Sequence, residues 1–401
     1  MSDEEDIDPL ALEVAEEISE NLSSKSGTWE NENLAQVKYK VLRGHREAIN
    51  SCQFCSNDSL ILTGSSDQTT AVWDVETGEK LQKYEGHRDV ISQCHMNSDA
   101  TNFASGSWDK TVNYWDTETG KILWTGSLEG IVTCCQLSHS GKFAAVGSDL
   151  ENALTIWDTS EGKIIHKMQN HHKSTPTSLT FSPNDDRICT TSMDGCTKMW
   201  DLHSHKVTVQ FSGHINVVSS CCFDKEERNL CTGSWDKHMK VWDVSCGTFR
   251  TQGPLTLSKG HEGCISSCVF SDDGSMLASG SYDTTVVVWD METFAPKLTL
   301  KGHEDWVTDV EFSKDSKTVL SCSKDKTLRV WNVSDSDSIP VVLESKRSMG
   351  LRIVKCKECR KPFSISQLED ATVQHMCVFC RLQASRNVPS FREEALMEMP
   401  G

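Results

Sequence analysis

The sequence predicts an all-β protein made of seven consecutive copies of one four-stranded unit. Three observations lead to this fold class. A Trp-Asp pair recurs along the chain, a Gly-His pair or its remnant precedes it, and short alternating apolar runs separated by turn residues lie between the two. Alternation with a period of two is typical of half-buried strands, and each copy contains four such runs.

The spacing of the copies is the strongest of these observations. The pairs begin at Trp73, Trp115, Trp157, Trp200, Trp242, Trp289 and Trp331, and the last pair is Trp-Asn. Successive tryptophans are 42, 42, 43, 42, 47 and 42 residues apart. In six copies a histidine precedes the tryptophan by 28 residues, namely His45, His87, His172, His214, His261 and His303. Spacing matched in this way does not arise by chance.

These residues resemble the WD40 repeat family, and the resemblance covers residues 38–334. It implies a seven-bladed β-propeller in which every blade is a four-stranded sheet. It also implies that a histidine, a Ser or Thr, an Asp and a tryptophan form a hydrogen-bonded tetrad inside a blade. The six expected tetrads are His45, Thr63, Asp67 and Trp73; His87, Ser105, Asp109 and Trp115; His172, Thr190, Asp194 and Trp200; His214, Thr232, Asp236 and Trp242; His261, Ser279, Asp283 and Trp289; and His303, Ser321, Asp325 and Trp331.

The same residue types also suggest the catalytic triad of a hydrolase. An active site occurs once per domain, whereas this combination occurs six times at one spacing. The sequence contains no P-loop, no dinucleotide-binding fingerprint and no His-Glu-x-x-His motif. We therefore expect a protein that is not an enzyme and that has no catalytic residues.

The third copy departs from the pattern. Leu128 stands at its histidine position and Val146 at its threonine position, and the turn at 148–153 is one residue longer. We expect a degenerate structural blade whose polar members were lost together, so that no partner is left without a hydrogen bond.

Many cysteines also follow the repeat. Cys52, Cys94, Cys135, Cys221 and Cys268 stand seven residues after the histidine position of five copies. This recurrence predicts a buried packing position on the first strand of each blade, where cysteine acts as a small hydrophobic residue.

Seven sheets must close into a ring, because an open array leaves two sheet edges exposed. The last copy lacks an outer strand after Asn332. The alternating segment 37–42 precedes the first copy, and we expect it to pair with blade seven as this strand. Residues 339–343 are the competing candidate.

The resemblance also implies that partners bind the face that carries the tetrad Asp turns, where the residue before each Asp points outward. The residues at this position are Ser66, Trp108, Met193, Trp235, Tyr282 and Lys324. Trp306 begins a first strand near the same face. Exposed aromatic side chains are typical of binding hot spots, so we predict that Trp108, Trp235, Tyr282 and Trp306 form one exposed patch. The alternative is that these rings only cap neighbouring blades.

The C-terminal segment contains two Cys-x-x-Cys pairs separated by 17 residues. Two such pairs are typical of a structural zinc site with four thiolate ligands, and the ion replaces a core that so short a segment cannot build. We predict one zinc ion bound by Cys356, Cys359, Cys377 and Cys380, with His375 as a weaker substitute ligand. Unpaired thiols in a flexible tail are the alternative.

Sequence composition predicts the organisation of the rest. We expect an acidic tail at 1–36, the propeller at 37–334, a linker at 335–350, the zinc module at 351–384 and a disordered tail at 385–401. In the first tail, residues 10, 14, 18 and 22 are apolar, a pattern of either a short amphipathic helix or a solvated acidic segment.

The net charge is −18, and nine acids with no base lie in residues 1–20. A chain this acidic repels the phosphate backbone, so we expect no nucleic-acid partner. No run of 18 apolar residues exists, and the acidic N-terminus does not resemble a signal peptide, so we expect no membrane association and a cytoplasmic or nuclear location.

Together these patterns predict a non-enzymatic scaffold that binds protein or peptide partners, a monomeric propeller within a complex. The alternative is a fixed subunit or substrate-recognition component of a larger enzyme complex, such as a ubiquitin ligase or a chromatin assembly.

Overall fold

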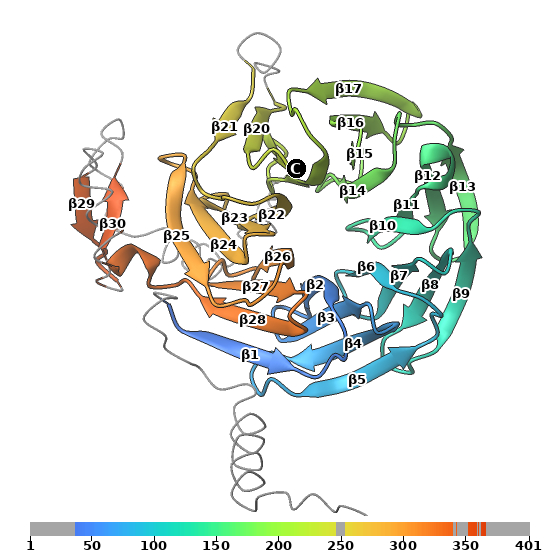
Figure 1. The fold of residues 1–401 in the computed structure, drawn as a ribbon, viewed down its shortest axis with the longest axis horizontal. Helices are drawn as coiled ribbons and strands as arrows, with labels where there is room; N and C mark the ends of the chain where they lie inside the picture. The colour runs from blue at the N-terminus through green and yellow to red at the C-terminus, as the bar shows by residue number, and fades with distance from the viewer. Residues whose placement is uncertain are drawn as a thin grey trace, which may run out of the picture. The chain divides into compact units, whose positions relative to one another are not determined.

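The computed structural model describes residues 37–245, 253–339, 342, 352–358, 360 and 362–365. The chain divides into two compact units, one ending at Asn332 and one beginning at Val333, and each is described by itself. The first unit contains seven four-stranded antiparallel sheets arranged in a ring around a central opening (Figure 1). The predicted seven-bladed propeller is confirmed.

Each of the first six blades is a set of four strands that follow one another in the chain and pair in that order. Blades one to three are β2 (Ile49–Cys55), β3 (Leu60–Ser65), β4 (Thr69–Asp74) and β5 (Lys80–Glu85); β6 (Ile91–Met96), β7 (Asn102–Ser107), β8 (Thr111–Asp116) and β9 (Ile122–Ser127); and β10 (Val132–Leu137), β11 (Phe143–Ser148), β12 (Ala153–Asp158) and β13 (Lys163–Met168). A short 3-10 turn, η1 (Leu150–Asn152), joins β11 to β12.

The remaining blades follow the same plan, and blade seven takes its outer strand from the start of the propeller. Blades four to seven are β14 (Pro176–Phe181), β15 (Arg187–Ser192), β16 (Cys196–Asp201) and β17 (Lys206–Ser212); β18 (Val218–Phe223), β19 (Asn229–Ser234), β20 (Met239–Asp243) and β21 (Leu255–Leu257); β22 (Ile265–Phe270), β23 (Met276–Ser281), β24 (Thr285–Asp290) and β25 (Ala295–Lys301); and β26 (Val307–Phe312), β27 (Thr318–Ser323), β28 (Thr327–Asn332) and β1 (Tyr39–Arg43).

The apolar pattern of a strand depends on its place in the blade. Both faces of the middle strands are covered by neighbouring blades, so every residue of β23 is buried. One face of the outer strand β5 is covered much less, and its exposure alternates along the strand. Continuous apolar runs therefore mark the middle strands, and alternating runs mark the outer ones.

The ring closes through β1. This strand pairs antiparallel with β28, with Tyr39 opposite Trp331 and Leu42 opposite Leu328. It contains most of the segment 37–42 that the alternating pattern selects. The competing segment 339–343 is described only at Ile339 and Val342, and β1 holds the outer place in the sheet.

Adjacent blades pack face to face, and the apolar core lies between them. At the junction of blades seven and one, Leu42, Ile49, Trp73, Leu320 and Leu328 are in contact, and each is at most 1% exposed. The five cysteines seven residues after the histidine position are buried in equivalent packing positions, as the sequence predicts.

The glycine of the Gly-His pair is explained by the tryptophan of its own blade. A Cβ atom added to Gly260 would lie 2.2 Å from Cζ2 of Trp289, and one added to Gly86 would lie 2.7 Å from Cη2 of Trp115. These separations are too short for any side chain. The pair recurs because the indole ring packs directly against the backbone there.

The second unit contains η2 (Ser336–Ser338) and an antiparallel hairpin of β29 (Arg352–Lys355) and β30 (Pro362–Ile365). Cys356 follows β29 and is buried. The other three predicted zinc ligands, His375 and the two predicted tails lie outside the described residues. No helix in the described part of the chain is long and apolar enough to span a membrane.

Candidate interaction face of the propeller

The predicted tetrads are present as hydrogen-bonded chains in six blades. Histidine Nδ1 lies 2.8 to 3.1 Å from a carboxylate oxygen of the tetrad Asp. Histidine Nε2 lies 2.7 to 2.9 Å from the Ser or Thr hydroxyl oxygen. In five of these blades the indole N–H of the tryptophan donates to the same hydroxyl oxygen over 2.8 to 3.0 Å.

Burial determines the protonation of the tetrad in blade seven. Burial lowers the pKa of His303, and Asp325 opposes this only in part, so the imidazole is neutral at pH 7. Burial alone would raise the pKa of Asp325, but hydrogen bonds from His303, from the Thr327 hydroxyl and from the Glu304 backbone N–H outweigh burial and lower it. The neutral ring therefore donates from Nδ1 to the carboxylate and accepts the hydroxyl proton at Nε2.

The tetrads are structural groups. Their hydroxyl-bearing residues are at most 1% exposed, which leaves a substrate no access to them. The tetrad Asp also accepts the backbone N–H of the residue after the histidine, for example Arg88 over 2.9 Å and Glu304 over 3.0 Å. Each tetrad thus holds the loop above its blade in one conformation.

Blade four is a variant among the described tetrads. The hydroxyl of Thr190 lies 2.9 Å from Nε2 of both His171 and His172. The indole of Trp200 instead packs against two further imidazoles, with ring centroids 5.5 Å from His166 and 5.7 Å from His205. The sequence pattern did not indicate the second imidazole on Thr190.

Blade three corrects one expectation. Its polar members were expected to have been lost together without leaving any group unpaired, but the buried indole N–H of Trp157 has no hydrogen-bond partner among the described residues. The reason is the apolar side chain of Val146 at the position where other blades carry the accepting hydroxyl. A buried N–H without a partner destabilises this blade by about 1–3 kcal/mol.

Substitutions in blades three and six should have opposite effects. Val146→Thr should stabilise the propeller by about 1 kcal/mol, because the new hydroxyl can accept the Trp157 N–H and donate to the carbonyl of Thr155 on the facing strand. His261→Leu should destabilise it by about 1–3 kcal/mol, because Ser279 and Asp283 lose their buried partner. Urea unfolding measures both effects.

Leu128→His is the matched control for this prediction. It restores the histidine but not the hydroxyl, so it should give no gain in the free energy of unfolding. If Val146→Thr also gave none, the unsatisfied indole would not be the cause of the difference between the blades.

The outward residues before the tetrad Asp occupy equivalent places. Each donates its backbone N–H over 2.8 to 3.0 Å to the carbonyl of the third residue after the histidine of its blade. This bond is shared by Ser66, Trp108, Met193, Trp235, Tyr282 and Lys324. The repeated geometry puts all six side chains on one face of the ring, here called the top face.

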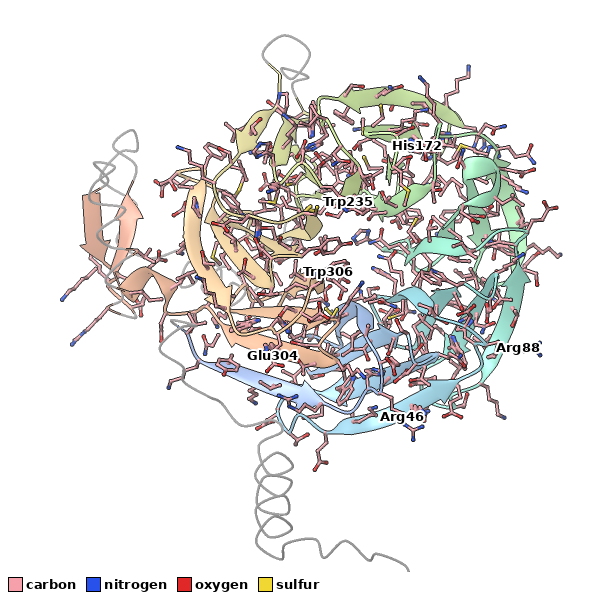
Figure 2. The ribbon with its side chains drawn as sticks, viewed as in Figure 1. Arg46, Arg88, His172, Trp235, Glu304 and Trp306 are labelled. Carbon is pink, nitrogen blue, oxygen red and sulfur yellow. The ribbon has the colours of Figure 1, made fainter. Side chains whose placement is uncertain are left out.

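Three of these blades form a continuous aromatic patch, defined here as Trp235, Tyr282 and Trp306. The rings of Tyr282 and Trp306 are stacked, with centroids 4.4 Å apart and planes 18° apart. The ring centroids of Trp235 and Tyr282 are 6.2 Å apart, and Nζ of Lys324 lies 4.0 Å from the ring centre of Trp306. Figure 2 shows Trp235 and Trp306 beside the central opening, with Arg46 and Arg88 farther out.

The predicted four-ring patch is wrong for Trp108. Its side chain is 47% exposed, but it stands on blade two, and among the described residues no ring contact joins it to Trp235, Tyr282 or Trp306. Met193 on blade four is 48% exposed. The alternative of capping rings holds in part for Tyr282, which is half-buried between its two aromatic neighbours.

Sequence reasoning missed Ile215, which is 92% exposed on the top face. It follows the tetrad histidine of blade five, in a loop whose Val217 carbonyl accepts the N–H of Trp235. The equivalent residues of the other tetrad blades are charged, namely Arg46, Arg88, Lys173, Glu262 and Glu304. An apolar residue at a position that is otherwise charged was the available signal.

A channel of about 320 Å³ runs through the ring and is lined by the first strands of all seven blades. Polar side chains there tie neighbouring blades together. The Asn50 amide donates to the carbonyl of Ile91 over 2.8 Å, and the Thr133 hydroxyl donates to that of Pro176 over 2.7 Å. These bonds make the ring stiff around its opening.

Two half-buried carboxylates that line the channel add further hydrogen bonds at the junction of blades seven and one. Asp309 accepts the Cys52 N–H over 3.1 Å and the Ser267 hydroxyl over 2.7 Å, and Glu311 accepts the N–H of Phe54. Burial raises the pKa of Asp309 to about 6. Both acids hold blade seven against blade one.

The described geometry is that of a WD40 propeller, and comparison with known proteins agrees. The family described as WD domain, G-beta repeat matches residues 36–74, 78–116, 162–201, 205–243, 253–290 and 294–332. The chain therefore belongs to the WD40 repeat family. The matches leave out residues 117–161, which include β10, β11 and β12 of blade three, the blade without a tetrad histidine. Propellers of this family generally act as non-catalytic scaffolds for protein interactions.

Individual relatives extend this result. Human WD repeat-containing protein 88 is 47% identical over 361 residues, which are 89% of this chain and 76% of that protein. A guanine nucleotide-binding protein β subunit of Arabidopsis thaliana is 29% identical over 192 residues, 47% of this chain and 41% of that protein. The U5 small nuclear ribonucleoprotein 40 kDa protein of Dictyostelium discoideum is 26% identical over 171 residues, 42% of this chain and 36% of that protein.

Proposed function

We propose that this protein is a non-enzymatic scaffold that binds a protein or peptide partner on its top face, through the aromatic patch. The stacked rings of Tyr282 and Trp306 carry this proposal. Large aromatic side chains at a surface are the residues that contribute most to protein interfaces. Because stacking already restricts these rings, they lose little side-chain entropy when a partner binds.

The surroundings of the patch support the same proposal. Ile215 and Met193 extend the apolar surface over blades four and five. Lys324 on the Trp306 ring provides a charge at its border, an arrangement of apolar centre and polar rim that is usual for interfaces. Lys324 and Met193 are thus further partner-binding residues in this proposal.

The combined variant Tyr282→Ala/Trp306→Ala should weaken partner binding at least ~30-fold, because two adjacent hot-spot residues are truncated. Partners are first captured by proximity labelling with the full chain, and the dissociation constant of the main partner is then measured for each variant. Thermal unfolding should change little, because Trp306 is 42% exposed and the half-buried Tyr282 packs against the two other rings of the aromatic patch.

Trp108→Ala is the matched control, since its ring has the equivalent place on blade two. It should leave the affinity within about twofold of the parent. Loss of binding with Trp108→Ala and retention with the double variant would contradict the proposal. One partner recovered in fixed stoichiometry would indicate a dedicated subunit of a larger complex, and several exchanging partners would indicate a scaffold.

We further propose that the second unit binds one structural zinc ion through Cys356, Cys359, Cys377 and Cys380. The described hairpin supports this, because Cys356 is buried at the end of β29 and its carbonyl accepts the N–H of Arg360 over 3.0 Å within the connecting turn. A turn that folds back between two paired strands is a suitable frame for a Cys-x-x-Cys pair. Thiolate ligands must stay reduced, which agrees with the cytoplasmic or nuclear location that we propose.

A further inference from the structure

Three cysteine side chains meet inside the propeller, at the junction of blades five and six. Cys222 on β18 and Cys231 on β19 are directly opposite each other in the ladder, and Cys268 on β22 faces them from the next blade. Their three sulfur atoms all lie within 4.8 Å of one another, and Sγ of Cys222 is 3.9 Å from Sγ of Cys268. We call these residues the cysteine triad.

Repeat packing explains only part of the cysteine triad. Cys268 has the packing position that four other blades also fill with cysteine, and Cys231 is the equivalent of Cys189 in blade four. Cys222 stands eight residues after the histidine, where the other blades carry Gln53, His95, Gln136, Thr180, Val269 and Glu311. Packing alone therefore does not account for the third sulfur.

The surroundings of the cysteine triad suit a soft ion. The hydroxyl of Ser220 lies 3.1 Å from Sγ of Cys268. The three residues are 9%, 0% and 4% exposed, in chain order. Cys222 and Cys268 also line the central channel, which gives an ion a route inward.

We propose that the cysteine triad is a binding site for one monovalent copper ion. Three sulfurs placed ~2.3 Å from a central ion in one plane lie about 4.0 Å from each other, close to the separation of Cys222 and Cys268. Thiolate ligands select soft ions such as Cu(I) and zinc.

The number of ligands favours copper over zinc. Among the described residues no fourth His, Cys, Asp or Glu joins the three sulfurs, and protein zinc sites are almost always four-coordinate. Copper bound by two thiolates and one thiol carries one net negative charge. Two of the three thiols release their protons to the solvent as the ion binds, and no oxidation step is involved.

The test is a Cu(I) titration of the full chain without oxygen, against a chelating competitor. All variants also carry Cys356→Ser, Cys359→Ser, Cys377→Ser and Cys380→Ser, so that the second unit cannot contribute thiolates. In this background we compare the intact cysteine triad with Cys231→Ala and with the matched control Cys189→Ala. Both positions precede the tetrad threonine, and blades two, three and six carry alanine there, so both variants should fold.

The intact triad and Cys189→Ala should each bind one Cu(I) ion with the same affinity. Cys231→Ala should bind Cu(I) more than ~100-fold more weakly. Loss of a ligand should exceed the 10–100-fold loss of affinity that follows when a residue supporting a ligand is mutated. X-ray absorption should show three sulfur neighbours, and Cu(I) should raise the unfolding temperature of the intact triad and Cys189→Ala only. Equal binding by all three proteins, no binding by the intact triad, or a different ligand set would overturn the proposal.

Discussion

Leu42→Asp should destabilise the propeller by about 4 kcal/mol or more, beyond the range of most single substitutions. Leu42 is fully buried in β1, opposite Leu328, and packs with Ile49 of blade one. Replacing a buried leucine by alanine costs about 2–5 kcal/mol, and an unpaired carboxylate at this place adds the cost of burying its charge. The variant also loosens the strand that closes the ring, so the edge of β28 becomes exposed.

Urea unfolding followed by tryptophan fluorescence measures this effect. Arg43→Asp is the matched control, since it is the next residue of β1 and is exposed, and it should change the free energy of unfolding by no more than about 0.5 kcal/mol. Similar effects of the two substitutions would mean that β1 does not close the ring in solution.

If the second unit binds zinc as proposed, removal of the ion should unfold this unit and leave the propeller intact. Structural zinc contributes about 10–16 kcal/mol to the folding of small domains of this kind, so a strong chelator should make residues 352–384 sensitive to protease. No tryptophan lies in residues 333–401, so tryptophan fluorescence does not report on the second unit and should not change. The purified chain should contain one zinc per molecule by elemental analysis.

Two variants separate the predicted ligands from nearby groups. Cys356→Ser/Cys359→Ser should lower the zinc content well below one per chain, and His375→Ala should leave it unchanged. A content far below one in the parent, or a ratio that the double variant does not alter, would exclude the four-cysteine site.

The number of blades and the composition of the tetrads could be predicted from the sequence alone. The hydrogen-bond chain in a blade needs the same four residue types at the same spacing every time, so repetition reveals it. The Gly-His pair recurs in five blades, because the contact of Gly260 with Trp289 recurs between equivalent residues of those blades. Local, repeated requirements of this kind are visible in a linear chain.

Contacts between blades were decided by the tertiary structure. Whether Trp108 joins the rings of Trp235 and Trp306 depends on which blades are neighbours on the top face. The sulfur of Cys222 meets that of Cys268 only because the facing strands of two blades bring them together. Trp157 lost its acceptor in a blade that otherwise replaced polar residues by apolar ones. Such features depend on single residues that differ from their equivalents and on distances across the ring, and a periodic pattern contains neither.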